Sequence, residues 1–161
     1  MTMGIGSVLL GIVVGMVLMG LIVWKVMPKM MLILHKSSKS FDETVAAIGD
    51  AVKKKKDWKI LGVNDFQKSI REGGHGDINR IGSVALCNPR YSSRILDDDG
   101  NKKVTAFMPI EIGIYEDKSR QVYVSELNVG LLGKMFGGTI GEVMSDAGKD
   151  IKDMIGTLAQ K

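Results

Sequence analysis

An uncharged, strongly apolar run dominates the N-terminal part of the hydropathy pattern. Residues 2–24 carry no charge and consist mostly of Val, Leu, Ile, Met and Gly. Since a helix rises 1.5 Å per residue, about 20 such residues cross a hydrocarbon core roughly 30 Å thick. Trp24 stands where an interfacial aromatic residue is expected, and Lys25 ends the run. The pattern predicts one transmembrane helix, and we assign the anchor to residues 1–28.

Two other interpretations of this run fit less well. A cleaved signal peptide has a basic region before a shorter apolar stretch and a small-residue cleavage site after it. Here no basic residue precedes the run, and the bulky sequence Trp24-Lys25-Val26 follows it. A core helix that is apolar on every side would need more surrounding protein than the rest of this chain supplies. We therefore expect a single-pass membrane protein.

The remaining residues, 29–161, alternate between helix-like and strand-like patterns and predict one small domain. The expected strands cover residues 58–63, 80–87, 104–115 and 121–128. The expected helices cover residues 41–56 and 65–72, a segment that begins at 89, and residues 140–158. Residues 30–34 fit either a first strand or the end of the anchor helix. The fold class expected is α+β, with a mainly antiparallel sheet covered by helices on one face.

Polar residues at the expected helix starts define these boundaries more closely. Ser40 and Thr139 are each followed three residues later by a glutamate, which is the capping-box pattern. Asn88 before Pro89 combines a favoured cap residue with proline at the first helical position. The sequence therefore predicts helices that begin near residues 41, 89 and 140.

The distribution of lysines predicts the orientation in the membrane. No lysine precedes the apolar run, whereas four follow it within about 15 residues, at Lys25, Lys29, Lys36 and Lys39. By the positive-inside rule the domain lies in the cytoplasm, with the chain in the inner (cytoplasmic) membrane. A single cysteine, Cys87, allows no intramolecular disulfide and is consistent with that compartment.

The net charge of +4 invites comparison with nucleic-acid-binding proteins. The basic residues gather at the membrane border and in the run 53–56, and no aromatic residues are interleaved with them. We therefore expect no nucleic-acid partner. The run 53–56 is typical of a solvated helix face, and attraction to anionic lipid is the alternative.

Small residues recur along one face of the anchor. Ser7, Gly11 and Gly15 are spaced four residues apart, and Gly4 lies on nearly the same face. Such spacing lets two transmembrane helices approach closely. We expect a homo-oligomer packed through this face, although glycine is also simply common in membrane helices.

Cys87 is the candidate for chemistry. It ends an apolar strand and precedes Asn88-Pro89, where amide donors at a helix N-terminus favour a thiolate over a thiol. A redox, persulfide or metal position is one interpretation. The alternative is a buried small hydrophobe, and the apolar strand before Cys87 favours burial. The sequence supplies no second cysteine as a resolving partner.

A glycine-rich segment precedes the last expected helix. It has the sequence Gly130-Leu-Leu-Gly133-Lys134-Met135-Phe136-Gly137-Gly138. A phosphate-binding loop requires G-x-x-x-x-G-K-[ST], and both the spacing and the residue after the lysine differ. The apolar side chains favour a mobile flap or a docking segment for a partner, with glycines as hinges. Lys134 and the following helix amides remain a possible anion site.

Four further polar positions are candidate site residues. His75 lies in a glycine-rich loop that could bring it to a ligand, and His35 lies at the membrane border. Their spacing predicts no metal site, whereas a haem needs only one axial ligand, so the cofactor stays unknown. Glu111 and Glu126 would face each other if the hairpin turned near residues 118 and 119, and could then share a proton or bind a cation.

Four motifs between Phe41 and about Ile155 resemble the family catalogued as domain of unknown function 302, of the membrane-anchored type. They are Phe41-Asp-Glu-Thr-Val45, Leu86-Cys-Asn-Pro89, Met108-Pro109 with Tyr115-Glu116, and Asn128-x-Gly130 through Gly138. The resemblance implies a compact α+β fold that tends to dimerise, and related domains occur near sulfur and redox metabolism. It implies no established reaction. With one cysteine and no fused rhodanese-like segment, sulfur transfer would require a partner thiol.

Three functions fit these observations, and an enzyme is not the favoured one. The first is a membrane-anchored binding or assembly module, an accessory or scaffold subunit of a membrane protein complex in redox or sulfur metabolism. Its contacts would be the segment from Gly130 to Gly138 and the last helix, with Asn88 and His75 as further candidates. The second is a sulfur or redox carrier, or an enzyme, that uses Cys87. The third is a sensor of a small anionic or haem-like ligand.

Overall fold

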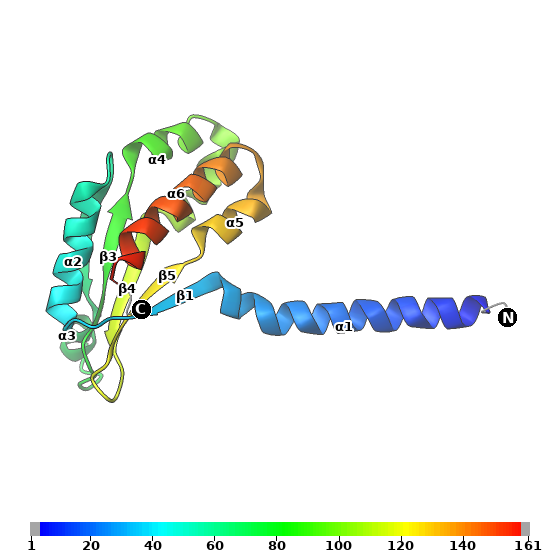
Figure 1. The fold of residues 1–161 in the computed structure, drawn as a ribbon, viewed down its shortest axis with the longest axis horizontal. Helices are drawn as coiled ribbons and strands as arrows, with labels where there is room; N and C mark the ends of the chain where they lie inside the picture. The colour runs from blue at the N-terminus through cyan, green and yellow to red at the C-terminus, as the bar shows by residue number, and fades with distance from the viewer. Residues whose placement is uncertain (1–3, 159–161) are drawn as a thin grey trace.

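The computed structural model describes residues 4–158 (Figure 1). Residues 1–3 of the expected anchor and residues 159–161 of the expected domain lie outside them. The helices are α1 (Ile5–Met31), α2 (Phe41–Lys54), α3 (Phe66–Glu72), α4 (Pro89–Leu96), the 3₁₀ helix η1 (Asp99–Phe107), α5 (Val129–Phe136) and α6 (Gly138–Gly156). The strands are β1 (Leu32–Lys36), β2 (Lys59–Asp65), β3 (Ile81–Cys87), β4 (Ile110–Glu116) and β5 (Val122–Leu127).

The five strands form one antiparallel sheet in the order β1-β5-β4-β3-β2. Alternate residues along β4 and β5 are buried, and these are the residues that face α2 and α6. The core contains Ile48 and Val52 from α2, Ile112 and Ile114 from β4, Val124 from β5, and Ile151 and Ile155 from α6. The α+β class and the antiparallel sheet agree with the sequence prediction, because period-2 strands can bury one face under amphipathic helices.

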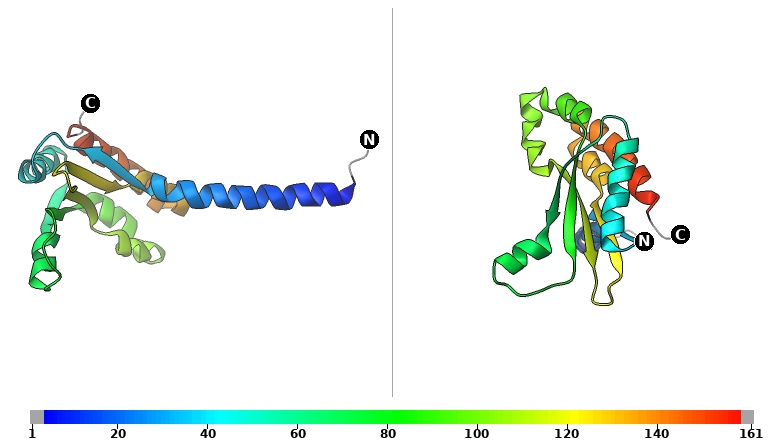
Figure 2. Two further views of the ribbon diagram at one scale, coloured as in Figure 1. Left: turned by 90° about the horizontal axis from the view of Figure 1, so that it is seen from below. Right: turned by 90° about the vertical axis from the view of Figure 1, so that its left-hand side faces the viewer.

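Helix α1, the expected anchor, projects away from the domain (Figures 1 and 2). Over Gly6–Met31 it is long and apolar enough to cross a membrane, and its most apolar part is not buried against the rest of the chain. It passes Pro28 and ends at Met31, three residues beyond the expected boundary, and β1 follows at once. Of residues 30–34, the first two therefore end the helix and the other three begin the strand.

Hydrogen bonds from Asn128 join the C-terminal end of α1 to the domain. Its backbone N–H donates to the carbonyl of Met31 at 2.7 Å, and its side-chain Nδ2 donates to the carbonyl of Met30 at 3.0 Å. Its Oδ1 accepts from the backbone N–H of Leu131 at 3.1 Å and so caps α5. The last carbonyls of a helix lack partners within it. One side chain therefore serves the C-terminus of α1 and the N-terminus of α5.

The glycine-rich segment is a helix packed on α6, and the expected mobile flap is replaced by a close helical hairpin. A Cβ on Gly133 would lie 2.8 Å from Cβ of Met144, and one on Gly148 would lie 2.9 Å from the backbone nitrogen of Gly130. These glycines let the two helix backbones approach. Gly137 supplies the turn, with a φ of 67° that side chains rarely adopt. Whether the segment binds a partner stays a prediction.

Two expected boundaries were wrong. Thr139 does not cap the last helix, because α6 begins at Gly138 with Gly137 as its cap residue and without a side-chain cap bond. The expected long strand 104–115 is divided: residues through Phe107 form η1, and β4 begins only at Ile110. Pro109 has no N–H for a sheet hydrogen bond, so the alternating pattern before it does not continue the strand.

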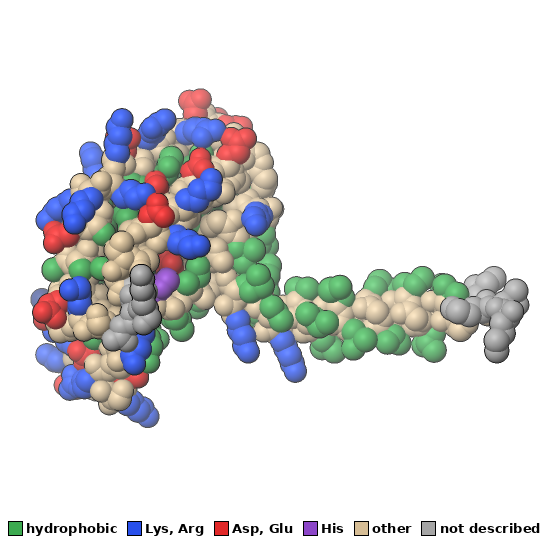
Figure 3. All heavy atoms as spheres, in the orientation of Figure 1, with side chains coloured by type: hydrophobic (Ala, Val, Ile, Leu, Met, Phe, Trp, Pro, Cys, Tyr) green, Lys and Arg blue, Asp and Glu red, His purple; other side chains and the backbone are tan. Residues whose placement is uncertain are grey.

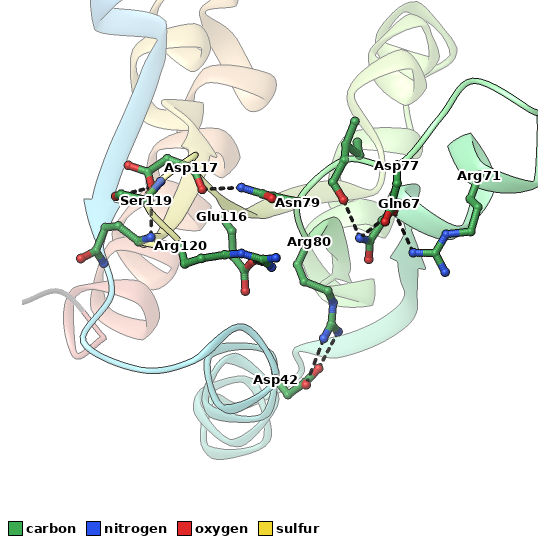
Figure 4. A network of polar contacts seen from close by, with 12 residues as sticks. Asp42, Gln67, Arg71, Asp77, Asn79, Arg80, Glu116, Asp117, Ser119 and Arg120 are labelled. Atoms are coloured by element: carbon green, nitrogen blue, oxygen red, sulfur yellow. Dashed lines mark hydrogen bonds and ion pairs between the residues drawn. The ribbon is translucent and has the colours of Figure 1, made fainter.

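The capping box at Ser40 is present as expected, with Glu43 N–H bonded to the Ser40 hydroxyl. Near this helix start, Arg80 joins α2 to β3 through two hydrogen bonds to Asp42, of 2.7 and 3.2 Å, while its guanidinium lies 4.4 Å from the ring centre of Phe41 (Figure 4). The Arg80 contact holds the pKa of Asp42 below its usual value. This network secures the end of the sheet that carries the β4–β5 turn.

An apolar pocket as the candidate binding site

A pocket of about 260 Å³ lies between the sheet, α4, η1 and α6. Most of its wall is apolar. The apolar wall consists of Trp58, Leu86, Tyr91, Ile95, Val104, Ala106, Phe107, Met108, Pro109, Ile110, Leu127, Val129, Val143, Met144 and Ala147. Phe107 is exposed, so the pocket opens to the outside there. The volume exceeds the roughly 150 Å³ of a cavity that holds benzene and approaches the lower limit for drug-sized ligands.

Three small polar side chains gather in the pocket wall where β3 meets α4. The Cys87 Sγ atom lies 3.4 Å from the Ser92 hydroxyl. Asn88 uses its Oδ1 to cap α4, accepting from the N–H groups of Arg90 and Tyr91 at 3.1 and 3.3 Å. Its Nδ2 has no hydrogen-bond partner in residues 4–158. An amide donor, a hydroxyl and a thiol are thus available to a polar end of a ligand.

The aromatic part of the wall is fixed by one carboxylate of α6. Asp150 Oδ2 accepts from the indole Nε1 of Trp58 at 2.9 Å and from the hydroxyl of Tyr91 at 3.1 Å. Its Oδ1 accepts from Lys55 Nζ at 3.1 Å. The Trp58 and Tyr91 rings meet edge to face, with centres 6.1 Å apart. Asp150 therefore orients two aromatic walls that come from distant parts of the chain.

The titration of these groups follows from their contacts. Burial raises the pKa of Asp150, but hydrogen bonds from Trp58, Lys55 and Tyr91 outweigh it and leave the pKa below its ordinary value. Burial, reinforced by the hydrogen bond to Asp150, raises the pKa of Tyr91. Hydrogen bonds to Asp153 and Asp150 raise the pKa of Lys55. At neutral pH the cluster therefore holds a carboxylate, an ammonium and an un-ionised phenol.

Two of the residues singled out from the sequence meet at this pocket. Cys87 and Asn88 line it, and Cys87 is half-buried, whereas the sequence favoured full burial. His75 is exposed in the α3–β3 loop and does not line it. Gly130 to Gly138 also lie outside the pocket wall. Ser7, Gly11 and Gly15 lie on α1, far along the anchor, and no other atom comes within 4 Å of a Cβ placed on either glycine.

The expected pairing of Glu111 with Glu126 is wrong. The register pairs Glu126 with Ile112, so Glu111 points to the opposite face of the sheet. Glu126 is instead 3% exposed and lies 3.0 Å from His35 Nε2 of β1. Its second oxygen, Oε2, is buried and has no hydrogen-bond partner in the described part of the chain. A single-residue difference in register thus replaces a pair of carboxylates with a carboxylate–imidazole pair.

The sequence did not reveal most of the pocket. Trp58, Tyr91 and Asp150 lie far apart in the chain, and no spacing rule connects them. The one available signal was Asn88-Pro89, which placed Cys87 beside a helix start. No cluster of three or more His, Cys, Asp or Glu side chains that could hold a metal is found over residues 4–158.

Comparison with known proteins gives a family and a fold. The family described as "Domain of unknown function DUF302" matches residues 33–158. A crystal structure of an uncharacterised conserved DUF302 protein from Bacillus stearothermophilus is similar, with a TM-score of 0.70 and 18% sequence identity. The match covers 80% of this chain and 98% of that one, and at this identity it shows the fold alone. No curated protein matched. The chain belongs to the DUF302 family of domains of unknown function.

Proposed function

We propose that this chain is a membrane-anchored binding module whose pocket holds a small, largely apolar molecule. The observation that carries the proposal is the combination of an apolar wall with three polar groups at one place, Cys87, Asn88 and Ser92. Binding sites for small molecules typically have this composition, with few polar groups that fix orientation. The pocket volume of about 260 Å³ fits one or two rings or a short acyl chain better than a nucleotide or a haem.

The anchor determines where such a ligand would be bound. The helix Ile5–Met31 is apolar and exposed up to Trp24, and Lys25 and Lys29 in its last turns are followed by Lys36 and Lys39. In this proposal α1 crosses the cytoplasmic membrane and the domain lies on the cytoplasmic side. A reporter that is active only in the cytoplasm, fused after Lys161, is then active. Activity only from a reporter that requires export would place the domain on the other side.

Assembly forms part of the same proposal. Ser7, Gly11 and Gly15 are open on the anchor surface, so two copies of α1 could pack through them. The domain would then act as an accessory subunit that presents a ligand or a docking surface to a membrane complex, including one of redox or sulfur metabolism. Purification in mild detergent followed by native mass spectrometry measures the number of copies, any bound small molecule and any partner chain.

A pair of neighbouring serines supplies the matched control for the ligand. Ser92 lines the pocket, whereas Ser93, the next residue of α4, is exposed and does not. Ser92→Leu fills the polar end of the pocket, and Ser93→Leu makes the same chemical change outside it. We expect a bound small molecule to be lost from the first variant and kept in the second. Retention in both, or absence from the wild-type chain, would contradict the proposed site.

Cys87 supports a second candidate function, a sulfur carrier. The thiol is half-buried on the pocket wall, beside a hydroxyl and at the start of a helix. Its sulfur could attack the outer sulfur of a persulfide R–S–SH, so that a new S–S bond forms on Cys87 while the S–S bond of the donor breaks and R–S⁻ leaves. The leaving thiolate takes up a proton, and no external oxidant is required. Incubation with a small-molecule persulfide and intact-mass measurement would detect one added sulfur, lost in Cys87→Ser.

A further inference from the structure

The C-terminal end of α5 carries apolar side chains that the domain leaves uncovered. Met135 is 63% exposed and Phe136 is 41% exposed. Phe136 packs edge to face on Phe107, whose ring centre is 5.9 Å away and which is itself 40% exposed. The preceding residues Leu132 and Gly133 are buried. Helix α5 therefore has one face in the core and an apolar end that projects outward.

This end of α5 lies on the side of the domain from which the anchor extends. Asn128 joins the start of α5 to the end of α1, and the two helices are in contact. Figures 1 and 2 both show α5 beside the last part of α1, on the side of the domain from which α1 extends. In Figure 3 hydrophobic side chains cover this margin of the domain next to the anchor. Insertion of α1 would bring the margin to the bilayer surface.

Basic side chains border the same surface. Lys25 and Lys29 lie in the C-terminal part of α1, and Lys134 precedes Met135 on α5. All three are exposed and form no ion pair within residues 4–158. The nearest acidic residue at the start of α6 along the chain, Glu142, is paired with Arg94 at 2.7 Å. The surface therefore combines exposed Met and Phe side chains with uncompensated positive charge.

We propose that the surface formed by Phe107, Met135 and Phe136, bordered by Lys25, Lys29 and Lys134, rests in the headgroup layer of an anionic bilayer. This inference rests on the proposed membrane insertion of α1. Apolar residues with flanking lysines bind at the boundary between headgroups and acyl chains, and anionic lipid attracts the lysines. Because the anchor is already inserted, this contact adds little ordering cost and fixes the tilt of the domain.

The contact also brings the pocket close to the membrane. Phe107 belongs both to the pocket wall and to the proposed lipid-contacting surface. A molecule dissolved in the bilayer could therefore reach the pocket along Phe107 without crossing bulk water.

The test uses the full chain in nanodiscs of phosphatidylcholine, with and without phosphatidylglycerol. An environment-sensitive NBD label is attached to Met135→Cys in a Cys87→Ser background, and to Lys118→Cys, at the exposed β4–β5 turn, as the control. We expect the label at 135 to emit at shorter wavelength and to be quenched by lipids with a spin label near the headgroup, most strongly with phosphatidylglycerol. Lys134→Glu should reduce both effects, and position 118 should show neither.

A second measurement needs no substitution. Hydrogen exchange of the wild-type chain should slow across residues 135–139 when phosphatidylglycerol is added to the nanodiscs. Equal, water-like signals at positions 135 and 118, with unchanged exchange, would overturn the proposed surface. If the chain inserts into the nanodisc and still gives that result, the proposed membrane insertion of α1 stands and only the lipid contact is refuted. Failure of the chain to enter the nanodisc would refute both.

Discussion

The indole Nε1 of Trp58 donates a 2.9 Å hydrogen bond to Asp150, 92 positions later in the chain. The same carboxylate oxygen accepts from the hydroxyl of Tyr91. Trp58 is only 6% exposed, so if Asp150 were removed, water could not fully replace the carboxylate as the partner of the indole N–H. This contact connects the last helix, α6, to two walls of the pocket.

Asp150→Ala should therefore destabilise the domain. Leaving the buried Trp58 N–H and the half-buried Tyr91 hydroxyl without this acceptor costs on the order of 1–3 kcal/mol in the free energy of unfolding. Denaturant unfolding followed by tryptophan fluorescence measures the loss. Asp153→Ala is the control. Asp153 is mostly exposed, and it pairs with Lys55 Nζ at 3.0 Å without touching Trp58 or Tyr91. Equal effects of the two substitutions would show that Asp150 does not hold the pocket wall.

The pKa of Asp150 also predicts a pH dependence. Its folded-state pKa lies below the ordinary value of 3.8, so its contribution to stability is present above that pH and is lost as the pH falls through the folded-state pKa. The stability difference between wild type and Asp150→Asn should be constant from pH 5 to about pH 7 and should shrink below about pH 4. A difference that grows toward acid would contradict the assigned contacts.

The anchor predicts an effect on association. Gly11→Ile and Gly15→Ile should weaken detergent-resistant oligomers, because a branched side chain separates backbones at a small-residue contact. Gly20→Ile is the control, since Gly20 does not continue the four-residue spacing of Ser7, Gly11 and Gly15. Crosslinking and size measurement in detergent give the oligomer fraction. If all three variants match the wild type, assembly does not depend on this face.

The exposure of Cys87 predicts its reactivity. Because the thiol is half-buried on the wall of an open pocket, iodoacetamide should label the native chain without denaturant, more slowly than a free peptide thiol. The chain has one cysteine, so intact mass reports this site alone. Ser92→Leu should slow the labelling and Ser93→Leu should not. Labelling only after unfolding would mean that iodoacetamide cannot reach the thiol in the folded protein, which contradicts the expected access through the pocket.

The elements of the fold could be predicted from local patterns, and the pocket could not. The helix start at Ser40 and the strand before Cys87 follow from spacing and capping chemistry that a few neighbouring residues express. Thr139 had the same capping pattern, but the left-handed backbone at Gly137 decides where α6 begins.

Side-chain partners across the sheet depend on register, which no single segment specifies. Glu126 was expected opposite Glu111 and lies instead against His35, because the strand pairing differs by one residue. The glycines from Gly130 to Gly138 indicated an unusual backbone conformation or a close contact. The sequence alone did not distinguish a flexible hinge from close packing of two helices. That distinction depends on Gly141 and Gly148 of the partner helix.

The most direct test of the proposed binding module is a titration of the full chain in micelles with indole, observed through methionine methyl groups. Met108 and Met144 line the pocket, whereas Met16 and Met19 lie on the anchor. Binding predicts saturable shifts of the first two signals, abolished by Ser92→Leu and retained in Ser93→Leu, with the anchor signals unchanged. Shifts that never saturate, that affect anchor and pocket methyls alike, or that persist in Ser92→Leu would contradict a ligand site in this pocket.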